Sequence, residues 1–249
     1  MQNFKMTLAY DGTGYAGWQS QKNAPTVQET IEKVLHRILQ EDVCLIGASR
    51  TDAGVHALGQ VANFASDTQL SCEILERGCN ALLPSDIRIL EIEKVPFSFH
   101  AQYHAKKKLY RYTIIKAPQV LPQERFFVYH YPVRLNVLAM RRAARFLVGM
   151  HDFSSFQGSD SKRRLKTSRR RVFRLDVIQR KGRLLFEIEA NGFLYTMVRT
   201  IVGTLLEVGN GRRTAESIKP LLSKRDRRLA GKTLPARGLC LVKIWTKKL

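Results

Sequence analysis

Two kinds of hydrophobic periodicity alternate along this chain, in the same order twice. Apolar residues at every second position predict half-buried strands, and apolar residues at every third or fourth position predict amphipathic helices. In the first half, Phe4, Met6, Leu8 and Tyr10 show the strand pattern. Helices are predicted at residues 26–39 and 70–82, and further strands at 43–49, 59–65 and 86–95. Strand, helix, two strands, helix and strand is the split βαβ order of a ferredoxin-like unit.

The second half repeats the order of elements without repeating the residues. Strands are predicted at residues 108–115, 171–180, 183–190 and 239–246, and helices at 136–148 and 192–208. We therefore expect an α+β protein made of two ferredoxin-like βαββαβ halves. The simplest architecture joins their strands in one extended antiparallel sheet with helices on one face and a central cleft.

Charge divides the chain at the same place. Residues 1–105 hold 8 Lys and Arg against 12 Asp and Glu, a net charge of −4. Residues 106–249 hold the other 34 and 9, a net charge of +25. Charge that served only solubility would not segregate in this way. We expect two domains, residues 1–105 and 106–249, the second with a surface for a polyanion such as nucleic acid or an anionic membrane.

Membrane insertion and disulfides are not expected. The longest apolar stretch, residues 190–209, carries Arg199 at its middle, which disfavours insertion by roughly 2.5–3.5 kcal/mol. The N-terminus lacks the pattern of a signal peptide, and the four cysteines form no CxxC pair. These features predict a cytoplasmic protein with reduced thiols.

The densest group of chemistry-bearing residues is the run GASRTDAGVHA at residues 47–57. It predicts a strand leading into a short loop that carries Arg50, Asp52 and His56. Glycines let a backbone approach a substrate closely, and a neighbouring Arg favours the ionised form of Asp. An ionised carboxylate in a cleft can act as a nucleophile or a base. The alternative is structural: Asp52 caps a turn and Arg50 is its surface partner.

Metal and nucleotide cofactors are not indicated. Asp52 and His56 stand four residues apart, yet no further ligands cluster near them. His151 and Asp152 resemble half of a metal-dependent phosphohydrolase signature, without obvious partners for the other half. The chain has no P-loop, no dinucleotide-binding glycine fingerprint and no G-x-S-x-G motif.

Two basic segments fit nucleic-acid binding. Lys106, Lys107 and Lys108 lead into a strand on which Tyr110 and Tyr112 share a face. One of these tyrosines could stack on an unstacked base, although core packing is the commoner role. Residues 162–171 hold seven cations in ten residues, for which phosphate contact is the expected use. The candidate phosphate ligands there are Arg163, Arg164, Lys166, Arg169 and Arg170.

Arg199 is the only charged residue in the apolar segment 193–199 of its predicted helix. A buried arginine needs an anionic partner. A structural ion pair is one explanation, and Asp52 is the partner that we expect.

In combination, these segments resemble the TruA-type tRNA pseudouridine synthases. The likeness covers nearly the whole chain and is most specific in RTDAGVHA at residues 50–57. It also includes YDGTGYAGWQ (10–19), NALLP (80–84), FHA (99–101), YRY (110–112), HDFSSF (151–156), residues 193–199 and PARGL (235–239). The sequence departs from the usual family residues at Asn63, Gln102, Thr196, Leu234 and Cys240.

The resemblance implies isomerisation of uridine to pseudouridine at positions 38–40 of the tRNA anticodon stem-loop, without a cofactor and by a homodimer. It implies that Asp52 is the nucleophile and that Arg50 helps to extrude the target nucleotide. Tyr110 would pack on the flipped uracil, and Arg199 would hold Asp52 in place. Two other functions remain open from composition alone: a non-catalytic RNA-binding protein and a hydrolytic RNA enzyme.

Overall fold

The computed structural model describes residues 1–159 and 167–247. Packing divides the chain into two compact units. The first unit comprises Met1–Lys106 and Cys240–Leu249, and the second comprises Lys107–Leu239. Each unit contains strands covered by helices, and the predicted long helices and strands occur in the expected order along the chain. The elements that were not predicted are α3 (Ala101–His104), β6 (Tyr129–His130), β7 (Gly149–Asp152) and α6 (Ile218–Lys224). The α+β class is therefore confirmed.

The strands of the first unit are arranged around β1 (Gln2–Tyr10). β3 (His56–Ser66) and β4 (Ile87–Val95) pair antiparallel with its two edges, and the short β2 (Ile46–Gly47) pairs with β3. Phe4, Met6 and Leu8 are fully buried, as the alternation in the sequence predicts. β1 and β3 thus form the centre of this unit and lead directly into the loops that surround Asp52.

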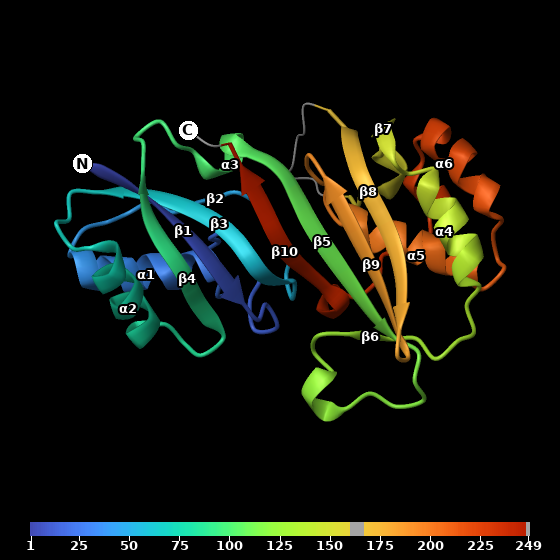
Figure 1. The fold of residues 1–249 in the computed structure, drawn as a ribbon, viewed down its shortest axis with the longest axis horizontal. Coiled ribbons are helices and arrows are strands. Elements are labelled where there is room, and N and C mark those ends of the chain that lie inside the picture. Colours follow the sequence, from blue (N-terminus) through green and yellow to red (C-terminus); the bar gives the residue numbers. More distant parts are fainter. Residues whose placement is uncertain (160–166, 248–249) are drawn as a thin grey trace. The chain divides into compact units, whose positions relative to one another are not determined.

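Two helices, α1 (Val27–Leu39) and α2 (Cys72–Leu82), pack together on one face of these strands (Figure 1). α1 begins where the sequence predicts, because the Thr26 side chain accepts a hydrogen bond from the backbone N–H of Glu29. Ser71 caps α2 in the same way through Ile74. A short helix, α3 (Ala101–His104), follows β4.

The final strand, β10 (Leu239–Thr246), belongs almost entirely to the first unit. From its position in the sequence, this strand is expected to complete the second half. In the structure Cys240 and Leu241 pair in parallel with His56 and Ala57 of β3. The hydrophobic pattern predicts a strand here, but it carries no information about which edge the strand joins.

In the second unit, β9 (Arg183–Ala190) lies between β5 (Ala105–Ile115) and β8 (Arg169–Arg180), antiparallel to both. β7 (Gly149–Asp152) extends the order beyond β8, and β6 (Tyr129–His130) pairs with β5. The side chains of β9 alternate between buried and half-buried positions. This alternation confirms the strand pattern read from residues 183–190.

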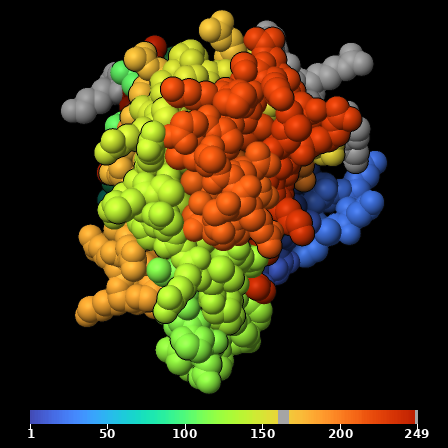
Figure 2. Space-filling model, turned by 90° about the vertical axis from the view of Figure 1, so that its right-hand side faces the viewer, coloured from blue at the N-terminus to red at the C-terminus, as the bar shows by residue number. Residues whose placement is uncertain are grey.

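Helices α4 (Val137–Arg145), α5 (Met197–Gly209) and α6 (Ile218–Lys224) pack in the second unit, α4 against α5 and β8, and α6 near β7. Figure 2 shows residues around 200–230, in orange to red, lying against the yellow-green α4 region. Short 3-10 turns occur at Pro122–Glu124, Ser154–Phe156, Ala215–Ser217, Arg227–Leu229 and Ala236–Gly238. No helix in the described residues is both long and apolar enough to span a membrane.

The start of α5 differs from the expected residue 192. Thr196 adopts a left-handed conformation with φ of 53°, which a right-handed helix cannot continue through, so α5 begins at Met197. Arg199 consequently lies in the first turn of α5 rather than at the middle of a longer helix.

Candidate active site

Asp52 lies in the loop that connects β2 to β3. Its carbonyl oxygen accepts a hydrogen bond of 3.1 Å from the N–H of Val55, which closes a tight turn over residues 52–55. Gly54 completes the turn with a φ of 73°, a conformation that favours glycine. The Asp52 side chain is half-buried, Arg50 is exposed, and Thr51 between them is only 4% exposed. The loop is therefore anchored through Thr51, between an exposed Arg50 and a half-buried Asp52.

Two polar side chains from the strands fix the entrance of this loop. The Tyr10 hydroxyl, at the end of β1, lies 2.8 Å from the Thr51 hydroxyl in a buried hydrogen bond. The Gln60 amide of β3 donates to the carbonyl of Ser49 at 2.6 Å and accepts from its N–H at 3.3 Å. Buried hydrogen bonds of this kind are costly to break, because their partners have no access to water.

A second loop, residues 11–19, packs backbone to backbone against the Asp52 loop. The N–H of Trp18 donates to the carbonyl of Thr51, and the N–H of Gly54 donates to the carbonyl of Tyr15. A Cβ atom on Gly17 would lie 2.7 Å from the Thr51 carbonyl oxygen, and φ at Gly17 is 104°. A Cβ on Gly12 would overlap the carbonyl of Val55. The glycines of this segment make the close approach possible.

The residues of segment 11–19 do not by themselves predict that the segment supports the Asp52 loop. In the sequence, the segment is notable only for its resemblance to the family. The available signal was the density of glycine, with Gly12, Gly14 and Gly17 within six residues beside Trp18. That spacing indicates a close backbone approach, but only the fold identifies the loop that is approached.

His56 contacts the segment of residues 11–19. Its ring is 4% exposed, and its Nδ1 atom lies 3.1 Å from the backbone nitrogen of Gly12 and 3.1 Å from a carboxylate oxygen of Asp11. The neutral ring accepts from Gly12, whereas a protonated ring would donate to Asp11, so one contact excludes the other. In residues 1–159 and 167–247, no three His, Cys, Asp or Glu side chains are grouped as metal ligands.

The two tyrosines of β5 have different surroundings. Tyr112 is fully buried, donates a 2.8 Å hydrogen bond to the carbonyl of Pro235, and has its pKa raised by burial. It is a core residue. Tyr110 is 5% exposed and makes an edge-to-face contact with Phe193, with ring centroids 5.0 Å apart. Tyr110 therefore packs against the segment that leads into α5.

Arg199 is half-buried in the first turn of α5. Its Nε donates to the carbonyl of Leu234 at 2.6 Å, so the side chain is held by the segment that follows α6. At the start of the same helix, the hydroxyl of Thr196 is buried and has no hydrogen-bond partner among the described residues. An unusual backbone conformation with an unsatisfied hydroxyl marks this helix start as locally strained.

The basic candidates divide into paired and clustered side chains. Lys107 forms an ion pair of 2.9 Å with Glu189 across the β5–β9 pair, whereas Lys106 is exposed. Burial, together with the positive charge of Arg170, lowers the pKa of Lys108 to about 8.

Arg169 and Arg170 lie at the start of β8. Arg169 is exposed, while the Arg170 guanidinium donates to the carbonyls of Thr167 and Arg169, at 2.9 and 2.7 Å. Burial lowers the pKa of Arg170. Lys108 and Arg170 thus form a partly desolvated pair of cations at one end of the β5–β9–β8 strands, a setting that favours an anion. Arg163, Arg164 and Lys166 lie outside the described residues.

Asp152 has a structural environment. It accepts hydrogen bonds from the backbone and hydroxyl of Ser154 and from the hydroxyl of Ser168, and it pairs with Arg225 at 3.1 Å. These donors lower its pKa against the opposing effect of burial. Asp152 organises the 3-10 turn at Ser154–Phe156, and the resemblance to a phosphohydrolase signature has no structural counterpart here.

The sequence is similar to proteins of one known family over nearly its whole length. Residues 6–104 and 143–245 match the family described as tRNA pseudouridine synthase. The chain is 46% identical over 245 residues to tRNA pseudouridine synthase A of a Thermoanaerobacter species, covering 98% of this chain and 99% of the relative. It is 47% identical over 247 residues to the protein of that name from Acetivibrio thermocellus, covering 98% and 100%. The corresponding protein of Clostridium acetobutylicum is 43% identical over 244 residues, covering 98% and 99%.

Proposed function

Because the chain belongs to the tRNA pseudouridine synthase family, we propose that it isomerises uridine at positions 38–40 of the tRNA anticodon stem-loop, with Asp52 as the reactive carboxylate. The observation that carries the assignment of Asp52 is its position in the loop between β2 and β3. Hydrogen bonds through Thr51, Ser49 and Gly54 hold that loop on both sides. A carboxylate held in this way is pre-organised for reaction.

The reaction breaks the C1′–N1 bond of uridine, turns the uracil and joins C1′ to C5. The proton on C5 leaves and N1 gains one, so the product is an isomer of the substrate. An ionised carboxylate serves this chemistry as a nucleophile toward C1′, as a nucleophile toward the base, or as the base in elimination to a glycal. All three routes require Asp52 in its ionised form. No redox change occurs, and our proposal includes no cofactor.

The target base must leave the helical stack before Asp52 can reach it, which costs a few kcal/mol. We assign Arg50 to the extrusion, since it is exposed two residues before Asp52. Tyr110 packs on the flipped uracil, and Arg199 pairs with the Asp52 carboxylate. If these assignments are right, replacing Arg50, Tyr110 or Arg199 should reduce turnover strongly while the variant protein stays folded.

The tRNA backbone is bound by the basic second half in this proposal. Its phosphate ligands are Lys106, Lys108, Arg169 and Arg170, together with Arg163, Arg164 and Lys166. Lys107 is the weakest of the proposed ligands, because Glu189 already neutralises it. We further propose a cytoplasmic homodimer in which one tRNA contacts both subunits.

The test compares Asp52→Asn and Asp52→Ala with the control Asp42→Asn, a fully exposed aspartate in the same unit. Each protein is incubated with unmodified tRNA transcript, and pseudouridine is mapped by carbodiimide-dependent reverse-transcription stops. We expect stops at positions 38–40 with the parent and Asp42→Asn proteins, and none with the Asp52 variants. All four proteins should bind tRNA with similar affinity.

Other outcomes point to other functions. Equal behaviour of all four proteins without any stops would indicate a non-catalytic RNA-binding protein. Strand cleavage in place of stops would indicate a hydrolytic enzyme. Stops that persist in the Asp52 variants would remove Asp52 from the reaction.

A further inference from the structure

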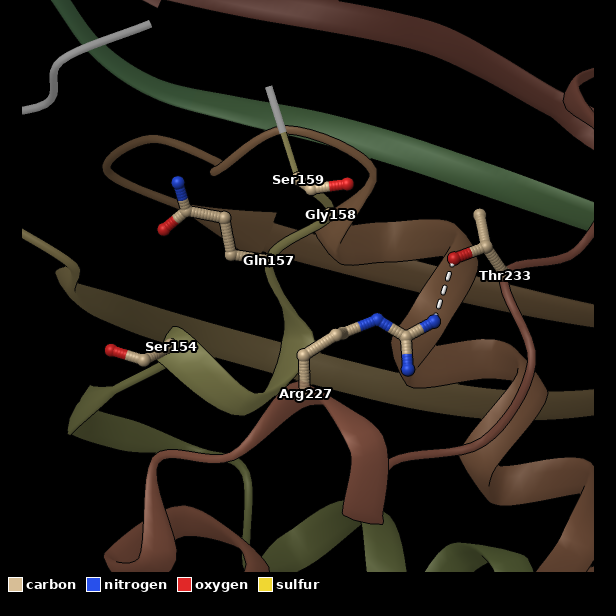
Figure 3. Close-up of a pocket in the computed structure, with 6 residues that line it drawn as sticks. All are labelled: Ser154, Gln157, Gly158, Ser159, Arg227 and Thr233. Carbon is tan, nitrogen blue, oxygen red and sulfur yellow. Dashed lines mark hydrogen bonds between the residues drawn. The ribbon is translucent and has the colours of Figure 1, made fainter. Parts of the chain in front are cut away.

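A pocket of about 500 Å³ opens in the second unit, within Lys107–Leu239. Its lining comes from the turn after β7 and from the segments that follow α6 (Figure 3). The residues that line it are Ser154, Gln157, Gly158, Ser159, Arg227 and Thr233. A volume of this size is in the range of pockets that bind small ligands.

Arg227 is the one charged residue among the described residues that line this pocket. Its guanidinium donates to the Thr233 hydroxyl at 2.8 Å and to the Ala230 carbonyl at 3.4 Å, and Figure 3 shows it extended toward Thr233, beneath residues 157–159. Thr233 is held in turn by a 3.1 Å hydrogen bond with Thr200 of α5. The guanidinium therefore has a defined orientation.

The charge of Arg227 is not neutralised by an ion pair among the described residues. Burial lowers its pKa, and the carboxylate that opposes this effect, Glu207, is itself bonded to Arg213 at 2.5 Å. A half-buried arginine that keeps three of its five N–H donors for another partner is suited to an anion with several oxygens.

The remaining lining residues supply neutral donors. The side-chain amide of Gln157 and the hydroxyl of Ser159 have no hydrogen-bond partner among residues 1–159 and 167–247. Ser154 is the exception, because its hydroxyl donates to Asp152. A fixed guanidinium beside neutral N–H and O–H donors is the chemistry that recognises a phosphate group.

We propose that this pocket binds a phosphodiester group of the RNA substrate, with Arg227 as its charged ligand and Gln157 and Ser159 as neutral donors. The inference rests on the proposed function, because it takes the tRNA backbone as the source of the phosphate. It adds a binding site in the turn after β7 and the segments that follow α6, built from residues other than the cations of β5 and β8. The pocket fixes the register of the RNA on the protein rather than reading its sequence.

The test measures tRNA affinity against salt concentration for Arg227→Gln, Gln157→Glu and the control Arg228→Gln. Arg228 is the next residue, 89% exposed and paired with Asp226, so its replacement removes the same charge outside the pocket. We expect the slope of log affinity against log salt to fall by about 1 in Arg227→Gln, with affinity about tenfold lower at low salt. Gln157→Glu places a carboxylate beside the phosphate and should weaken binding by a similar factor. Arg228→Gln should change both quantities much less.

Ethylation interference then locates the contact on the RNA. One or two phosphates whose ethylation blocks binding to the parent protein should lose that effect in Arg227→Gln. Because Arg227 also holds its own loop, the variant may only be compared if its thermal unfolding midpoint stays close to that of the parent. If it unfolds, Gln157→Glu carries the test alone, since the Gln157 side chain is not hydrogen-bonded to any residue that the structure describes.

Parent-like salt slopes in both pocket variants would overturn the proposal. Titration with inorganic phosphate alone distinguishes whether the pocket binds a free anion or a phosphate of the RNA backbone. If that titration depends on Arg227 while tRNA binding does not, the pocket serves a free anion and the RNA assignment is wrong. Pseudouridine formation by the parent protein is scored in the same samples. Its absence would contradict the proposed function, whereas its presence with unchanged slopes would contradict this inference alone.

Discussion

The hydroxyl oxygens of Tyr10 and Thr51 lie 2.8 Å apart inside the first unit, one residue before Asp52. This contact joins the end of β1 to the loop between β2 and β3. This buried hydrogen bond holds the backbone next to Asp52, the proposed reactive carboxylate, in a fixed position relative to β1. Much of the precision of the loop therefore depends on residues that do not touch the substrate.

Removing either hydroxyl should loosen the loop. In Tyr10→Phe or Thr51→Val, one buried hydroxyl partner is lost, so we expect the free energy of unfolding to fall by about 1–3 kcal/mol. Turnover should fall about tenfold more than tRNA affinity does. Urea unfolding and single-turnover kinetics measure the two effects. The double variant should cost less than the sum of the single ones, and strict additivity would show that the two hydroxyls are not coupled.

Gly17 should tolerate no side chain, because its φ is 104° and a Cβ would lie 2.7 Å from the Thr51 carbonyl oxygen. Gly17→Ala is expected to cost about 1–3 kcal/mol of stability and most of the turnover. Gly14→Ala is the matched control in the same loop, since a Cβ there meets no atom within 4 Å. Thermal unfolding and pseudouridine mapping compare the two. Similar behaviour of both variants would contradict the close packing that we describe.

Arg199→Ala should leave a folded protein with little activity. Loss of the 2.6 Å hydrogen bond to the Leu234 carbonyl is expected to cost about 1–2 kcal/mol of stability. If Arg199 pairs with Asp52 as proposed, turnover should fall by about two orders of magnitude or more. Single-turnover kinetics and circular dichroism test this expectation. Arg199→Lys should restore stability better than turnover, because an ammonium cannot reproduce the guanidinium fork. Survival of turnover in Arg199→Ala would refute the pairing.

Binding of tRNA should depend on pH through Lys108. Its pKa is lowered to about 8, so the side chain is cationic below this pH and becomes neutral as the pH rises above it. A bound phosphate raises this pKa, so affinity should decline progressively between pH 8 and pH 9.5, by about three- to tenfold. Lys108→Arg should flatten the profile, because a guanidinium stays protonated throughout. Lys107→Arg, at the neighbouring residue paired with Glu189, is the control and should keep the decline.

A profile that is equally steep in Lys108→Arg would assign the pH dependence to another group. Measurements by filter binding or fluorescence anisotropy at constant ionic strength keep the salt effect out of this comparison.

The periodicity in the sequence was sufficient to predict most elements. Buried Phe4, Met6 and Leu8 confirm the first strand, and Thr26 confirms the start of α1. The predicted start of α5 was wrong, because one residue adopts a backbone conformation that its side-chain type does not indicate. Thr196 in the left-handed region delays α5 by five residues, and no pattern of apolar residues encodes that angle.

The candidate site was predictable to different degrees. The RTDAGVHA run drew attention to Asp52 by itself, because its glycines and charges are dense and local. Residues from distant parts of the chain support that loop: Tyr10, Gly12, Gly17 and Gln60. Tyr110 and Tyr112 could not be separated by sequence, since both occupy one face of the same strand. Their neighbours, Phe193 and Pro235, make the difference.

By itself, the sequence determined the α+β class, most of the long helices and strands, the basic second half and the candidate loop around Asp52. Each of these features depends on residues that are close together in the sequence or that repeat with a short period, so the local sequence pattern is enough to predict it. The tertiary structure alone decided that the last strand joins β3, which tyrosine is a core residue, and that Arg227 lines a pocket. Such features depend on contacts between residues far apart along the chain, and chain closure and packing select those contacts only when the whole unit folds.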